Sequence, residues 1–90
     1  MSILIESETR SEYGVSYSLT CGNKSAYVGF NFTMQSVSVC VKNASHKVYR
    51  GSGRRFSDFE AAIEGYKSPE VKAMIRFLSE AINPDLAIAG

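Results

Sequence analysis

Residue types that carry catalysis or cross-link small domains are scarce in this chain. Its 90 residues include one histidine, two cysteines and no tryptophan. Two cysteines are too few for a disulfide scaffold or a four-ligand zinc site. A Ser-His-acid or Cys-His catalytic set would have to use His46, the single histidine. The shortages therefore exclude the disulfide-rich and metal-stapled classes of small domain, and they disfavour the common nucleophilic enzymes.

Long apolar runs and an N-terminal leader are also lacking. The longest apolar runs span a few residues, as in Ile3-Leu4-Ile5, whereas a transmembrane helix needs about 20. The N-terminus has neither the basic region nor the apolar stretch of a signal peptide. We therefore expect a cytoplasmic protein that makes no membrane contact, with both thiols reduced.

The overall composition is that of an ordinary globular domain. Hydrophobic residues make up 44% and charged residues 21%, which argues against intrinsic disorder. Ninety residues leave room for one core, so we expect a single domain over residues 1–90. Within it we expect a sheet over 1–56, helices over 57–83 and a loosely ordered tail over 84–90.

The first half of the chain alternates apolar and polar residues with a period of two, which is typical of half-buried strands. Residues 13–19, 26–32 and 36–42 show the pattern, and the links between them are short and rich in turn formers. Such links favour an antiparallel meander. Residues 46–50 and an edge strand at 2–8 would bring the sheet to four or five strands.

Alternation also assigns side chains to the two faces of that sheet. Tyr13 and Tyr17 are predicted to point into the core, and Tyr27 and Tyr49 outward. Cys21 falls on the apolar face and Cys40 on the other, so the two sulfurs cannot form a disulfide. The outer face is predicted to be smooth and polar, built from Gly14, Ser16, Ser18, Tyr27, Gly29, Asn31, Thr33, Ser36, Ser38 and Cys40.

The second half changes to helical periodicity. Ser57 and Glu60 fit a capping box at the start of a first helix, which breaks near Gly65. Ser68-Pro69 marks a second start and Asn83-Pro84 its end. Strands followed by helices predict an α+β fold, an antiparallel meander of four to five strands with two C-terminal helices on one face. The helical stripes are Phe59, Ala62, Ile63 and Tyr66, then Val71, Met74, Ile75, Leu78 and Ala81 or Ile82.

The chain offers few candidates for chemistry. For His46 and Cys40 we favour a structural or solvent-facing role over catalysis, because no local signature accompanies either residue. No metal-ligand spacing is present, and we expect no cofactor. Residues 51–55 (GSGRR) could expose backbone amides and arginines to an anion, but a flexible strand-to-helix connection is the favoured interpretation.

The net charge of +1 hides a strong segregation. Residues 1–12 carry −2, residues 13–57 carry +6 with no acidic residue, and residues 58–90 carry −3. The sheet and its exit are thus basic and the helices acidic. The residues predicted to anchor a partner or an anion through this basic region are Lys47, Tyr49, Arg50, Arg54 and Arg55.

Three stretches, 48–51 (VYRG), 56–63 (FSDFEAAI) and 66–70 (YKSPE), resemble the C-terminal half of small accessory proteins of phages and mobile elements, anti-CRISPR proteins among them. Those proteins end in a hairpin and two helices, the first opened by a Phe-Ser/Thr-x-Phe/Leu-Glu phrase. The resemblance implies a class of role, a small inhibitor or modulator that binds the surface of a larger complex, and it transfers no functional residue.

Together these observations predict a non-enzymatic, protein-binding modulator or inhibitor of a larger complex. The alternative is a single-stranded nucleic-acid-binding protein that uses the basic sheet, since lysine and arginine neutralise phosphates and exposed tyrosines stack on bases. A protein partner is favoured because six positive charges over residues 13–57 are not dense. A small hydrolase or transferase using Cys40 or His46 is the third hypothesis. The edge strand and the smooth face both permit a homodimer.

Overall fold

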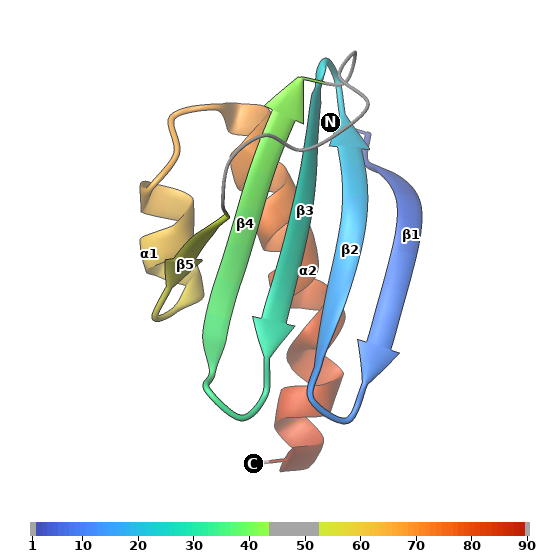
Figure 1. Ribbon diagram of the computed structural model, residues 1–90, viewed down its shortest axis with the longest axis vertical. Coiled ribbons are helices and arrows are strands. Elements are labelled where there is room, and N and C mark those ends of the chain that lie inside the picture. Colours follow the sequence, from blue (N-terminus) through green and yellow to red (C-terminus); the bar gives the residue numbers. More distant parts are fainter. Residues whose placement is uncertain (1, 44–52, 90) are drawn as a thin grey trace.

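The computed structural model describes residues 2–43 and 53–89. Within these residues the chain forms one five-stranded antiparallel sheet and two helices that lie on the same face of it (Figure 1). The strands follow one another in the sheet in chain order, so each pairs with its sequence neighbour. The elements are β1 (Leu4–Ser11), β2 (Gly14–Cys21), β3 (Lys24–Asn31), β4 (Ser36–Asn43), β5 (Arg54–Phe56), α1 (Phe59–Glu64) and α2 (Pro69–Ala89).

The core lies between the sheet and α2. Strand β2 alternates strictly between buried and half-buried residues, as its sequence predicts. Helix α2 packs across β2 and β3, while α1 packs beside β4 and β5 (Figure 1). Both predicted helical stripes face the sheet, which confirms the α+β arrangement. The most deeply buried large side chains are Leu19, Val28, Val37, Val39, Val71, Met74, Ile75, Leu78 and Ile82.

Tight turns connect the first four strands. Residues 12–13 and 22–23 form two-residue turns, and residues 32–35 join β3 to β4. Gly22 has a φ of 62° and Gln35 a φ of 52°. The turns at 22–23 and 32–35 therefore each contain one residue with left-handed backbone. Such short connections hold neighbouring strands in fixed register, which is what aligns the residues of the outer face.

Strand β5 is an element that the sequence pattern does not predict. Residues 54–55 were expected in a connecting loop, whereas Arg54–Phe56 pair with β4 at its outer edge. The free backbone groups of β4 and the packing of Phe56 against the core favour the extended conformation. The strand expected at 46–50 lies outside the described residues.

The predicted start of α1 is one residue off. Ser57 and Glu60 do not form the expected capping box, because Asp58 is the N-cap. Its backbone is extended and its Oδ1 accepts a hydrogen bond of 2.7 Å from the Ala61 amide. A carboxylate satisfies the free amide and also suits the positive end of the helix dipole, so it takes the position in preference to a hydroxyl. The predicted break at Gly65 is confirmed.

The start of α2 is confirmed and its predicted end is wrong. The Ser68 hydroxyl oxygen accepts a hydrogen bond from the Val71 amide, as expected for an N-cap before Pro69. The helix does not stop at Asn83-Pro84 but continues to Ala89, through the predicted tail. Proline removes the hydrogen bond to the carbonyl of Glu80. Because Glu80 lies on the exposed face of the helix, water can satisfy that carbonyl instead.

Candidate functional site: the open face of the sheet

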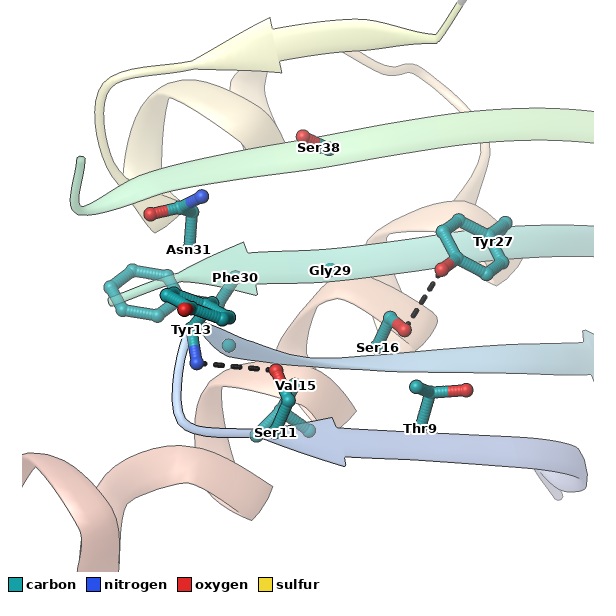
Figure 2. A pocket seen from close by; sticks show the side chains of 11 residues that line it. Thr9, Ser11, Tyr13, Val15, Ser16, Tyr27, Gly29, Phe30, Asn31 and Ser38 are labelled. Atoms are coloured by element: carbon teal, nitrogen blue, oxygen red, sulfur yellow. Dashed lines mark hydrogen bonds between the residues drawn. The ribbon is translucent and has the colours of Figure 1, made fainter. Parts of the chain in front are cut away.

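The face of the sheet opposite the helices is lined by small polar residues, and no helix or strand of residues 2–43 and 53–89 covers it. The register of the four strand pairs places one residue from every strand in a single row across this face: Thr9, Ser16, Gly29, Ser38 and Arg55. The neighbouring row contains Ser7, Ser18, Tyr27 and Cys40. We call this surface the open face. Because its side chains are short, the backbone of the sheet lies close to solvent (Figure 2).

Tyr27 is an aromatic residue whose side chain lies on the open face. Its hydroxyl donates a hydrogen bond of 2.8 Å to Oγ of Ser16 on the neighbouring strand (Figure 2). Ser16 is opposite Gly29 in the register, so the tyrosine side chain reaches past a position that has no side chain. The ring is thereby held against the sheet and is still 43% exposed. This confirms the outward orientation predicted for Tyr27.

Two shallow hollows flank this tyrosine. One, of about 280 Å³, extends from Tyr27 over Gly29 and Gly14 to Tyr13 (Figure 2). The other, of about 300 Å³, lies between Tyr27 and Arg55 and has Cys40 in its lining; we call it the Tyr27–Arg55 hollow. Each hollow is wide enough for a side chain or a single ring from a partner and too open to enclose a small molecule.

The prediction that Tyr13 points into the core is wrong. Its side chain is 66% exposed at the end of the first hollow. Tyr13 belongs to the two-residue turn before β2, so strand alternation begins one residue later, at Gly14. Tyr17, inside the strand, is buried as predicted and packs edge-on against Phe77 with ring centroids 5.2 Å apart.

Arg54 and Arg55 point to opposite sides of the sheet. Arg55 is opposite Ser38, which places it on the open face. Arg54 lies on the helix-bearing side, where its guanidinium donates a hydrogen bond of 2.9 Å to the carbonyl of Gly65. The same group lies 4.9 Å from the ring centroid of Phe56 and 5.1 Å from that of Tyr66. Arg54 therefore ties β5 to the end of α1, and of the two only Arg55 lines the open face with its side chain.

The other predicted anchors, Lys47, Tyr49 and Arg50, lie outside the described residues. The positive charges of residues 13–57 that the structure does place are divided between the two faces. Lys42 is opposite Ser25 on the open face, and Lys24 is opposite the buried Cys21 on the helix side. The described cations of this region are thus less concentrated on one face than the linear sequence indicates.

A chain of hydrogen bonds crosses the far end of the open face. Thr20 Oγ1 donates to a carboxylate oxygen of Glu6 over 3.0 Å. Since that hydrogen is used, Ser25 Oγ donates to Thr20 over the remaining contact of 2.9 Å. Glu6 sits where the β1–β2 register shifts, which turns its side chain toward the open face. The face is therefore polar along its length, with an acid near β1 and an arginine on β5.

Both cysteines are free thiols on opposite faces, Cys21 buried and Cys40 half-buried, as the alternation predicts. Among the described residues no cluster of three or more histidine, cysteine, aspartate or glutamate side chains could hold a metal ion. His46 lies outside them. No helix in residues 2–43 and 53–89 is both long and apolar enough to cross a membrane.

Neither the protein-family models, the curated proteins nor the solved structures contain a match to this chain. The open face is therefore assigned from its own geometry. Sequence alternation indicates Ser16, Ser38 and Tyr27 as outward residues. It did not indicate that Arg55 shares their row, because β5 was not predicted as a strand.

Proposed function

We propose that the chain is a non-enzymatic modulator or inhibitor that docks its open face on an acidic surface of a larger protein complex. The observation that carries the proposal is the Tyr27–Arg55 hollow, in which a half-exposed tyrosine and an arginine line the same depression. Within the described residues, Arg55 has no hydrogen-bond or ion-pair partner. The resemblance to small phage and mobile-element accessory proteins implies the same class of role.

These two side chains are of the types that dominate protein interfaces. Tyrosine and arginine are enriched among the residues whose truncation weakens binding most. Tyr27 is already held by Ser16, so little side-chain entropy remains to be lost when a partner covers the ring. The Arg55 guanidinium can make a bidentate contact with a carboxylate of the partner. The small residues between them let a flat surface approach closely.

Charge favours a protein over a nucleic acid as the partner. The described cations of the open face are Lys42 and Arg55, and Glu6 lies at the opposite end of it. A nucleic-acid strand presents a regular series of phosphates, which two cations neutralise poorly and a carboxylate repels. A protein surface with one or two well-placed acids matches this pattern better.

The test is affinity capture from the source cells with the wild-type chain, Arg55→Glu and a matched control, Arg76→Glu. Arg76 is exposed on α2, on the other side of the molecule, so both variants change the charge equally. We expect a specific protein that is retained by wild type and Arg76→Glu and lost with Arg55→Glu and with Tyr27→Ala. Circular dichroism confirms that the variants fold. Equal capture by Arg55→Glu and Arg76→Glu contradicts the proposal.

Single-stranded nucleic acid is the second candidate, and the exposed ring of Tyr27 favours it, since such a ring can stack on a base. Binding through Lys42 and Arg55 alone would give a shallow dependence on salt, with a slope of roughly −1.4 in log affinity against log salt. Fluorescence anisotropy with a labelled oligonucleotide at low salt decides this. Binding that is lost in Tyr27→Ala supports the candidate, and no binding removes it.

A further inference from the structure

Strand β1 ends the sheet on the side away from β5, and all eight of its residues are exposed. Within the described residues no strand pairs with its outer edge. Such an edge presents unpaired backbone groups and is a template for another strand. Its own geometry restricts which strand can pair with it and in what register.

The register shift between Ile5 and Ser7 divides β1 into two parts. Only residues 7–11 form a regular ladder with β2, because a bulge interrupts the pairing on the other side. The middle of this regular segment is Thr9. A second copy that pairs antiparallel over the whole segment must therefore place its own Thr9 opposite, on a twofold axis.

The hydrogen-bonding groups of β1 have the phase that this pairing requires. The Phe32 amide donates a hydrogen bond to the Tyr13 carbonyl over 2.9 Å. The backbone N–H and C=O groups of Tyr13 therefore point toward β3, and those of Gly14 point toward β1. Alternation then turns the backbone groups of Thr9 and Ser11 toward β2, and those of Glu8 and Arg10 toward the free edge. Around an axis at Thr9, Glu8 of one copy is opposite Arg10 of the other, and each such pair can exchange two hydrogen bonds.

The side chains of these two residues select the same register. Glu8 and Arg10 both lie on the helix-bearing side, opposite Tyr17 and Val15, with their charged groups 3.7 Å apart. Pairing around Thr9 sets unlike charges opposite each other at both positions. A shift in either direction that keeps the hydrogen-bond phase sets Glu8 against Glu8 or Arg10 against Arg10, and like charges directly opposite are unfavourable.

We infer that β1 is a self-association edge, and that two copies of the chain pair antiparallel over residues 7–11 with Thr9 on the twofold axis. The partner of this edge is thus a second copy of the chain, and the two sheets become one continuous sheet. The row Thr9–Ser16–Gly29–Ser38–Arg55 then runs on into the same row of the second copy. This inference does not depend on the proposed function, since the open face remains uncovered in the pair.

The test is a charge exchange followed by analytical ultracentrifugation over a range of concentrations. The wild-type chain is expected to show a reversible monomer–dimer equilibrium. Glu8→Arg alone and Arg10→Glu alone each set like charges opposite at both positions, and each is expected to weaken the dimer about tenfold. The double variant Glu8→Arg/Arg10→Glu restores unlike pairs and is expected to dimerise like wild type.

Mixing the two single variants gives an independent readout. One chain then has two arginines at these positions and the other two glutamates, so a heterodimer has unlike charges at both positions. We expect the mixture to dimerise more tightly than either variant does alone. A wild-type chain that stays monomeric at all concentrations overturns the inference, and so does dimerisation that the single charge reversals leave unchanged.

Discussion

At the scale of single residues, neighbouring arginines have separate tasks because a strand turns successive side chains to opposite faces. Arg54 is engaged by the Gly65 carbonyl and by the rings of Phe56 and Tyr66. Arg55 lies at the edge of the open face with no described partner. A pair that looks like one basic cluster in the sequence is thus one structural residue and one surface residue.

This difference predicts that alanine substitution lowers stability at Arg54 and leaves it unchanged at Arg55. Arg54→Ala is expected to lower the free energy of unfolding by about 1 kcal/mol, since it loses one hydrogen bond and two exposed cation–ring contacts. Arg55→Ala is expected to leave stability unchanged within about 0.5 kcal/mol, as for other surface substitutions. Urea unfolding of both variants measures this. Equal effects of the two substitutions would contradict the structural role of Arg54.

The pKa of Tyr66 gives a second measurement of the same contact. Burial raises the pKa of Tyr66, and the Arg54 charge opposes that rise. Removing the cation in Arg54→Ala should therefore raise the pKa of this tyrosine further, which NMR titration of its ring carbons can follow.

At this scale the sequence predicts what depends on alternation alone. The outward ring of Tyr27 and the separation of Cys21 from Cys40 follow from a period of two. The exposure of Tyr13 does not, because it depends on which residues form the turn. The sides taken by Arg54 and Arg55 depend on pairing with β4, and that tertiary interaction has no local pattern.

At the scale of elements, the N-cap residue of α2, Ser68, forms a hydrogen bond with the Glu70 carboxylate in the first turn of the helix. The Ser68 hydroxyl donates to a Glu70 carboxylate oxygen over 2.8 Å. This bond lowers the pKa of Glu70 below its ordinary value of 4.5, with smaller contributions from the Glu70 backbone amide and the Lys24 charge. The ionised carboxylate therefore stabilises the folded chain above that pH, and the effect is lost as the pH falls through the lowered pKa.

Glu70→Gln should accordingly be less stable than wild type near neutral pH and match it in acid. Urea unfolding of both chains at about pH 7 and about pH 3 measures the difference. Ser68→Ala removes the principal cause of the lowered Glu70 pKa. Its stability should therefore depend less on pH than that of wild type, as expected for Glu70→Gln. A difference between wild type and Glu70→Gln that is the same at both pH values would show that the carboxylate charge is not the cause.

Element boundaries were harder to predict than elements. Ser57 and Asp58 are both good N-cap residues, and the Asp58 carboxylate takes the position. Asn83-Pro84 has the composition of a helix end, but α2 continues through it because the lost hydrogen bond faces solvent. Strand β5 has one apolar residue, so no period could indicate it.

At the scale of the whole molecule, the core is unevenly distributed. Strands β2, β3 and β4 together with α2 contribute nearly all buried side chains, whereas α1 contributes Ala62 alone and β5 contributes none. We expect amide hydrogens in α1 and β5 to exchange measurably faster than those in β3 and in the middle of α2. Exchange followed by NMR or mass spectrometry tests this, and uniform protection throughout would contradict it.

The α+β fold itself was predictable because binary pattern, turn residues and helix caps all indicate the same arrangement. The small polar residues that β2, β3 and β4 place on the open face are predictable for the same reason. What could not be predicted is the division of the positive charges between the two faces, since Lys24, Lys42, Arg54 and Arg55 take their sides from strand register.

The strictly sequential strand order also determines how the chain can fold. Each of the first three pairings joins strands separated by a short turn, so it closes a small loop at little entropic cost. The hairpins can form one after another as the chain leaves the ribosome, whereas the pairing of β5 and the docking of α1 and α2 must wait for the C-terminal half. Until then the apolar face of the meander is exposed to solvent and to other chains. The docking of α2 covers this face and so removes the surface through which the nascent chain could aggregate.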